Sequence, residues 1–115
     1  MLEDVSVDAL QAALRGLSAR EQAISDNIAN VNTPYFNARR VAFEGQLRQA
    51  LNNGDNPLTA APSAFYTGDP AGLNGNNVDL NAETVLGVQT QMQYDLALRA
   101  VGDRFTLWRS AARGA

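Results

Sequence analysis

The sequence predicts a mainly α-helical protein whose two long terminal helices, at residues 4–32 and 80–112, pair as a coiled coil. Near both chain ends apolar residues recur every three or four positions, which is typical of a helix packed along another helix. Between the ends, residues 33–78 lose that periodicity and are rich in asparagine, glycine and proline. The 115 residues are therefore expected to form a single domain with an extended, irregular middle segment that is partly disordered in the isolated chain.

The N-terminal helix is expected from apolar residues in heptad spacing. These residues are Val7, Leu10, Leu14, Leu17, Ile24, Ile28 and Val31. Glu21 fills the one position of the seam that lacks an apolar side chain, and Asp4 or Ser6 can cap the start. Gly16 weakens the middle by about 1 kcal/mol. In isolation such a helix is marginal, so it is expected to need a partner.

The C-terminal helix carries two apolar lines. The first comprises Tyr94, Leu98, Val101, Phe105, Trp108 and Ala112, and the second comprises Val85, Val88, Met92 and Leu96. At 1.5 Å per residue the helix spans on the order of 45–50 Å. Two lines present more apolar surface than one partner helix covers. We expect one line to contact the N-terminal helix and the rest to contact something else.

Asparagine is concentrated where the first helix is expected to end. Asn32 can adopt the left-handed conformation that ends helices, and Pro34 cannot continue one, so simple termination is one interpretation. Asn27 and Asn30 lie within the last two turns, where asparagine costs about 0.5 kcal/mol relative to alanine. Alternatively, their amides hold a returning backbone strand, because an amide donates and accepts hydrogen bonds at once. Local sequence leaves both interpretations open.

Two polar motifs of the middle segment receive structural rather than binding interpretations. The run GLNGNNVD, residues 72–79, together with Asp69 suggests calcium, but it lacks the alternating acids and distal glutamate of an EF-hand. Asx and glycine turns are the favoured interpretation. Arg39 and Arg40 are interpreted as solvated arginines that follow a helix rather than as a phosphate site.

Composition excludes several classes of function. Cysteine, histidine and lysine are absent, which removes disulfides, thiolate metal sites and the commonest general base. The net charge is −3 and the arginines are scattered, so a nucleic-acid partner is not expected. No apolar run approaches the roughly 20 residues of a membrane span, and the acidic N-terminus does not resemble a secretory signal. We expect no enzyme activity, metal, cofactor or small-molecule substrate.

One longer stretch resembles a known family. LSAREQAISDNIANVNTPYFNARRVAFEGQLRQAL, Leu17 to Leu51, is similar to the N-terminal signature of bacterial flagellar rod and hook proteins. In that family a helix ending Asn-Ile-Ala-Asn leads into Thr-Pro and usually Gly-Tyr, where this chain has Tyr35 and Phe36. The later GNNVDLNAE, Gly75 to Glu83, and the short length resemble the proximal rod protein of the family.

The resemblance implies a structural subunit of the flagellar basal body. Its helices would pair as a coiled coil in a helical rod that transmits torque and surrounds the export channel. Neighbouring rod proteins, further copies of the chain, and the ring and export-gate proteins at the base would be its partners. It would leave the cytoplasm through the flagellar type III apparatus without a cleaved signal and would lie in the basal body, crossing the periplasm or cell-wall space.

Two sets of residues are predicted to carry this role. The hinge at the helix end comprises Asn27, Ile28, Ala29, Asn30, Thr33 and Pro34. The assembly seam comprises Leu10, Leu14, Leu17, Ile24, Ile28, Val31, Tyr94, Leu98, Val101, Phe105 and Trp108. The alternative function is a cytoplasmic coiled-coil adaptor or secretion chaperone, which explains the helices and the charge but does not require the hinge.

Overall fold

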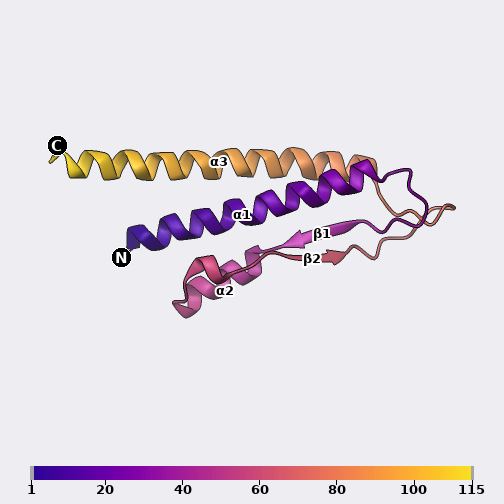
Figure 1. The fold of residues 1–115 in the computed structure, drawn as a ribbon, viewed down its shortest axis with the longest axis horizontal. Helices are drawn as coiled ribbons and strands as arrows, with labels where there is room; N and C mark the ends of the chain where they lie inside the picture. Colours follow the sequence, from indigo (N-terminus) through magenta and orange to yellow (C-terminus); the bar gives the residue numbers. More distant parts are fainter. Residues whose placement is uncertain (1, 115) are drawn as a thin grey trace.

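The computed structural model describes residues 2–114, which form a mainly helical, elongated molecule (Figure 1). The elements are α1 (Leu2–Ala29), β1 (Arg39–Ala42), α2 (Glu44–Asn53), the 3₁₀ turn η1 (Pro57–Thr59), β2 (Ser63–Tyr66) and α3 (Leu80–Ala112). The molecule measures 65 Å along its longest axis and 14 Å along its shortest. The long helix α3 therefore extends well beyond the small core of the molecule.

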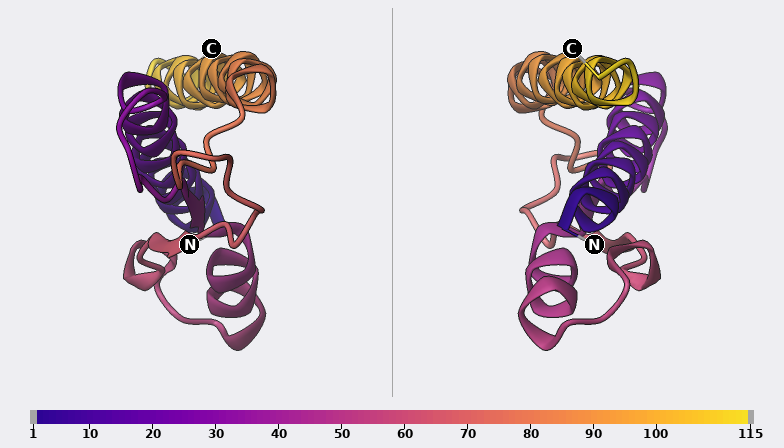
Figure 2. Two further views of the ribbon diagram at one scale, coloured as in Figure 1. Left: turned by 90° about the vertical axis from the view of Figure 1, so that its right-hand side faces the viewer. Right: turned by 90° about the vertical axis from the view of Figure 1, so that its left-hand side faces the viewer.

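The two long helices run in opposite directions and lie side by side at one end only. They meet where α1 ends and α3 begins, and they separate toward the two termini (Figures 1 and 2). At the meeting point Gly87 of α3 faces Ile24 of α1, and a Cβ added to Gly87 would lie in ordinary contact distance, 3.6 Å, from Cγ2 of Ile24. The arrangement differs from the predicted coiled coil, which would keep the helices together along their length.

The helix boundaries follow from local hydrogen bonds. Helix α1 ends at Ala29 rather than at the predicted residue 32, because the N–H of Asn30 already bonds the carbonyls of both Asp26 and Asn27 and the chain then turns. Helix α3 begins after Asp79, whose carboxylate accepts hydrogen bonds from the N–H groups of Asn81 and Ala82 at 3.1 and 3.2 Å. Helix α1 begins at Leu2, and the side chain of the predicted cap Asp4 lies outside the described residues.

The middle segment is more ordered than predicted. Residues 33–78 contain β1, α2, η1 and β2 instead of one irregular connector. Helix α2 stops at Gly54, which adopts the left-handed conformation (φ 72°), and the N–H of Asp55 bonds the carbonyl of Ala50 at 2.9 Å. The helix has only ten residues and buries Ala50 alone, so its apolar period is too short to recognise in sequence.

The small core lies between α1 and the segment formed by β1, α2 and η1. The ring of Phe43, only 4% exposed, lies against Gly16 of α1, where a Cβ would come within 2.2 Å of the ring. Leu17 and Ile24 of α1 are also buried, and the other buried apolar residues are smaller, namely Ala12, Ala23, Ala38, Val41, Ala50 and Ala60. Gly16, expected only to weaken the helix, therefore admits the largest side chain of the core.

Strands β1 and β2 form an antiparallel pair in which Arg39 lies opposite Tyr66 and Ala42 opposite Ser63. Strand β1 packs against α1, whereas all four residues of β2 are exposed. The sheet thus has an inner strand held by a helix and an outer strand that forms its margin (Figure 1).

Candidate functional site

Asn27 binds the returning strand at the junction between the long helices. Its side chain is fully buried, its amide Nδ2 donates to the carbonyl of Arg39 at 2.8 Å, and the N–H of Arg39 donates to its Oδ1 at 3.0 Å. One side chain thereby satisfies both backbone groups of a strand residue, as a neighbouring strand would. For Asn27 the strand-holding interpretation of the asparagine cluster is the one that the structure supports.

Asn30 has a different role. Its Nδ2 donates to the carbonyl of Asp26 at 2.8 Å, and its Oδ1 accepts from the hydroxyl of Thr33 at 3.0 Å. The amide therefore folds back onto its own helix and the turn that follows. For Asn30 the strand-holding interpretation is wrong, and helix termination describes its contacts.

The chain leaves the helix end through a tight turn at residues 33–36. The N–H of Phe36 bonds the carbonyl of Thr33 at 3.3 Å, and Tyr35 adopts φ 61°. Pro34 followed by a left-handed residue is the pattern of a type II turn, in which the left-handed position favours glycine. Tyrosine in a left-handed conformation costs about 1–2 kcal/mol.

Contacts with the loop before α3 offset this strain. The N–H of Tyr35 donates to the carbonyl of Asn74 at 3.0 Å. Its ring lies against Gly75, where a Cβ would approach the ring to 2.5 Å. Because Gly75 has no Cβ, the loop leaves room for the ring of Tyr35 beside the turn.

Two further asparagines, Asn76 and Asn77, bind the loop before α3 to both other segments of the junction. Asn76 donates from Nδ2 to the carbonyls of Asn30 and Thr33, each at 2.8 Å. Asn77 accepts the N–H of Ala38 at 2.6 Å. Both side chains are buried. Sequence reasoning assigned this run to turns and missed the contacts, for which the only signal was the density of asparagine.

A buried ion pair joins β1 to α3. Glu83, in the first turn of α3, is fully buried, and Arg40 of β1 donates to its Oε1. Its Oε2 has no hydrogen-bond partner among the described residues. The prediction that Arg40 is merely solvated is wrong, while Arg39 is partly exposed and lies 3.7 Å from Asp26. No pattern in the sequence indicated that the charged residue Glu83 would be buried.

Arg20 of α1 supports the other end of β1. Its guanidinium donates to the carbonyl of Val41 at 2.9 Å and forms two bonds with the carboxylate of Glu44, at 2.6 and 2.8 Å. It also lies 4.9 Å from the centre of the Phe43 ring. Hydrogen bonding from Arg20 lowers the pKa of Glu44 below its ordinary value.

The predicted assembly seam divides into a buried and an exposed part. Leu17 and Ile24 are buried, and five members are half-buried, namely Leu10, Leu14, Val31, Tyr94 and Val101. Ile28, Leu98, Phe105 and Trp108 are exposed, and Trp108 reaches 55%. The second apolar line of α3, formed by Val85, Val88, Met92 and Leu96, is exposed by 57–63%. The free chain thus carries a long apolar surface on α3.

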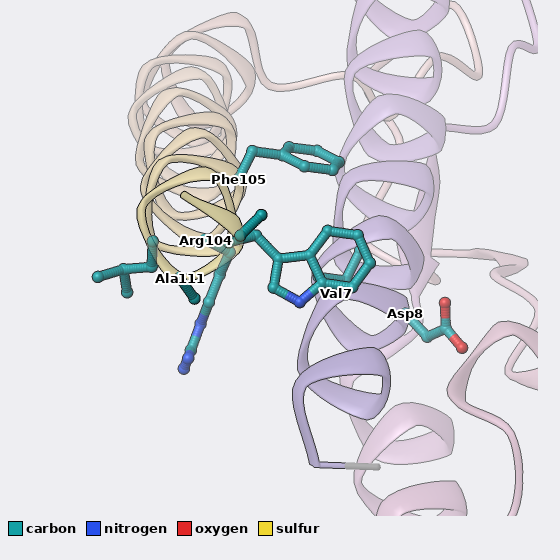
Figure 3. A pocket seen from close by; sticks show the side chains of 8 residues that line it. Val7, Asp8, Arg104, Phe105 and Ala111 are labelled. Atoms are coloured by element: carbon teal, nitrogen blue, oxygen red, sulfur yellow. The ribbon is translucent and has the colours of Figure 1, made fainter. Parts of the chain in front are cut away.

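A groove of about 860 Å³ opens where the helices separate. Val7 and Asp8 of α1 form one wall, and Arg104, Phe105 and Leu107 are among the residues of α3 that form the other. Figure 3 shows Phe105 pointing across the groove toward α1. An apolar groove between two helices has the shape that a further helix fills.

Between residues 2 and 114 no three acidic side chains gather in a group that could hold a metal ion. Over the same residues none of the helices combines the length and hydropathy needed to cross a bilayer.

Known relatives identify the kind of protein that carries this junction and these surfaces. No protein-family model matches the chain. The flagellar basal body rod protein FlgB of Borreliella burgdorferi is 36% identical over 112 residues, which cover 79% of this chain and 83% of that protein. The FlgB proteins of Bacillus subtilis and Escherichia coli are 26% and 25% identical, and they match 95% and 85% of this chain and 94% and 86% of their own lengths.

The relatives define a structural protein of the flagellar basal body. The chain belongs to the FlgB family of basal-body rod proteins. It is a component of the rod, where it assembles with other flagellar proteins.

Proposed function

We propose that the chain is a subunit of the proximal rod, in which α1 and α3 complete a coiled coil with neighbouring subunits around the export channel. The observation that supports this role is the exposed apolar line of α3, from Val85 to Leu96. An exposed apolar patch on a soluble chain marks an interaction site. A helix built for one partner would have no use for this second line.

Subunits of the rod would repeat by head-to-tail contacts, because such contacts generate an open helical array rather than a closed ring. The neighbours would be further copies of the chain, adjacent rod proteins, and the ring and export-gate proteins at the base. Torque would pass along the helices of this array. Export by the flagellar type III apparatus would carry the chain to its place across the periplasm or cell-wall space.

The hinge at residues 27–34 would set the angle at which the chain leaves α1. Asn27 holds β1, Asn30 ends the helix, and Thr33 and Pro34 form the turn. Ile28 and Ala29 are exposed between these contacts and remain available to a neighbour. The alternative, a cytoplasmic adaptor or secretion chaperone, has no support among the relatives.

A substitution on the exposed line tests the rod function. Met92 is 61% exposed in the free chain, so Met92→Asp should leave its folding intact while placing a charge inside the assembled rod. We expect a normal circular dichroism spectrum from the purified variant and loss of swimming in cells that carry it. Met92→Leu is the matched control, because it keeps an apolar side chain at the same position, and cells that carry it should swim. Normal swimming by Met92→Asp would contradict the proposal.

A further inference from the structure

The inner edge of the sheet is covered by side chains of α1. The backbone groups of Arg39 and Val41 point away from β2, and α1 supplies their partners. Asn27 bonds both groups of Arg39, and Arg20 bonds the carbonyl of Val41. No further strand has room to pair on this side.

The outer edge of the sheet, along β2, is open. In an antiparallel pair, residues whose backbone groups face the partner strand alternate with residues whose backbone groups face away. The N–H of Thr67 donates to the carbonyl of Ala38, so the backbone N–H and C=O groups of Ser63 and Phe65 face β1. Those of Ala64 and Tyr66 face outward. Among residues 2–114 nothing hydrogen-bonds to these four outward groups. Unpaired edge groups are a template for a strand from another chain.

Nothing on β2 protects this edge. Its four residues, SAFY, carry no charge, and natural proteins usually protect free edges with lysine, inward charges or proline. Phe65 is 50% exposed and Tyr66 is 67% exposed. Backbone groups at alternate positions fit only another extended strand, which limits the partner to one kind of structure.

We propose that the outer edge of β2 pairs antiparallel with β2 of a second copy of this chain. The chain has two strand edges in its described part, and the edge of β1 is covered by α1. The free edge that another copy can offer is therefore β2 itself. The product is a four-stranded sheet with a two-fold axis, in the order β1, β2, β2 of the partner, β1 of the partner.

The outward groups fix the register of this pairing. Each copy must place Ala64 opposite Tyr66 of the other, which makes four hydrogen bonds. A shift one way brings in Pro62, which has no N–H, and a shift the other way brings in Gly68, whose φ of 71° lies outside a strand. Phe65 then faces its own copy across the axis as a non-hydrogen-bonded pair, with Cα atoms about 4.5 Å apart.

The contact is small, so the dimer should be weak and reversible. Four residues a side lie below the range of stable interfaces, and the four backbone hydrogen bonds, which do not depend on any side chain, carry the contact. A two-fold contact closes on itself and does not propagate. We therefore expect the dimer to form between free subunits and not within the rod. Only this expectation rests on the proposed function.

A single cysteine at the axis tests the pairing. The chain has no cysteine, so Phe65→Cys introduces one thiol, and Cα atoms about 4.5 Å apart suit a disulfide. We expect mild oxidation of the purified variant to give a covalent dimer about tenfold faster than Leu73→Cys, because paired strands hold the thiols at a millimolar effective concentration. Leu73 is a fully exposed loop residue, so its cysteine reports random collision. Equal rates for the two variants would overturn the proposal.

A second substitution separates strand pairing from simple exposure. In the Phe65→Cys background, Ala64→Pro removes an outward N–H without touching the groups that face β1, and an edge strand tolerates proline there. Crosslinking should fall to the Leu73→Cys rate. Ala64→Val keeps the N–H and should retain fast crosslinking. If Ala64→Pro crosslinks as fast as Ala64→Val, the edge is not the contact. Both assays use the purified chain, so their failure leaves the rod function, which is tested by swimming, unaffected.

Discussion

At the scale of single residues, the contact between Gly16 and Phe43 opposes helix propensity. Alanine is preferred to glycine inside a helix by about 1 kcal/mol. At Gly16 the added Cβ would come within 2.2 Å of Cγ of the Phe43 ring, and this ring is buried and cannot move away cheaply. Overpacking a core costs about 1–3 kcal/mol, more than the gain in propensity. Gly16→Ala should therefore lower the free energy of unfolding measured in urea.

Gly102 is the matched control for that substitution. It lies in α3, and an added Cβ there meets nothing within 4 Å. Gly102→Ala should raise the helicity of the chain and leave the core unchanged. Stabilisation by both substitutions would show that Phe43 does not occupy the space above Gly16.

Asn27 and Asn30 should respond differently to alanine, although they belong to one motif. Asn27→Ala leaves the N–H and carbonyl of Arg39 without partners, at about 1–3 kcal/mol for each group. Asn30→Ala removes only contacts at the exposed helix end, so its cost should stay below about 1 kcal/mol. Urea unfolding of the two single variants measures both. Equal costs would show that Asn27 does not hold β1.

The role of a single residue could be predicted from the sequence where local structure, such as the end of a helix, limits what its side chain can bind. The amide of Asn27 was one of two candidates to hold a strand, since an asparagine inside a helix needs a reason. The pair of Arg40 and Glu83 was not predictable, because the two residues are 43 positions apart in the chain and only the tertiary fold brings them together. The contact between Tyr35 and Gly75 was hidden in the same way.

At the scale of elements, the long periodic helices were predictable and the short elements were not. Helix α3 runs over 33 residues with repeated apolar positions, whereas α2 has ten residues and each strand four. All four residues of strand β2 are exposed, so the strand has no buried face that an alternation of polar and apolar residues would reveal. Both strands exist because α1 and the asparagines of the junction hold β1, which is a tertiary effect.

The long helices should be stable at the junction and weak toward the termini. Around the junction α1 and α3 bury Ile24, Asn27, Glu83 and Thr90, whereas from residue 102 onward every described residue of α3 is exposed. Most helical stability comes from packing, so unpacked turns open easily. Hydrogen exchange of the free chain should show strong protection near the junction and weak protection over residues 98–112. Uniform protection along α3 would contradict this gradient.

At the scale of the whole molecule, folding depends on the junction where α1 ends and α3 begins, and the surfaces expected to serve assembly lie toward the two termini. The junction holds three segments through buried asparagines and the ion pair of Arg40 with Glu83, and it does not need a second chain. Toward the termini, the separated helices expose the groove and much of the predicted seam. Under the proposed function, neighbouring subunits would cover these surfaces.

Two substitutions in α3 should separate these functions. Glu83→Ala leaves Arg40 without its buried partner, and breaking such a pair costs about 3–5 kcal/mol when both groups are buried. Arg40 is 24% exposed, so we expect the lower end of that range in urea unfolding. Leu98 is 46% exposed in the free chain, so Leu98→Asp should lower its stability by about 1 kcal/mol, less than Glu83→Ala does.

In cells Leu98→Asp should be more damaging than Glu83→Ala, the reverse of their effects on stability. Glu83 is buried within the free chain, whereas Leu98 would be buried only in the assembled rod. Leu98→Asp should abolish rod assembly and swimming while export of the subunit continues, because the charge becomes buried only between chains. Glu83→Ala should reduce the amount of folded subunit, and its swimming should recover in part when expression is raised, because its assembly surfaces are intact. A Leu98→Asp strain that swims normally would show that this part of α3 stays exposed in the rod.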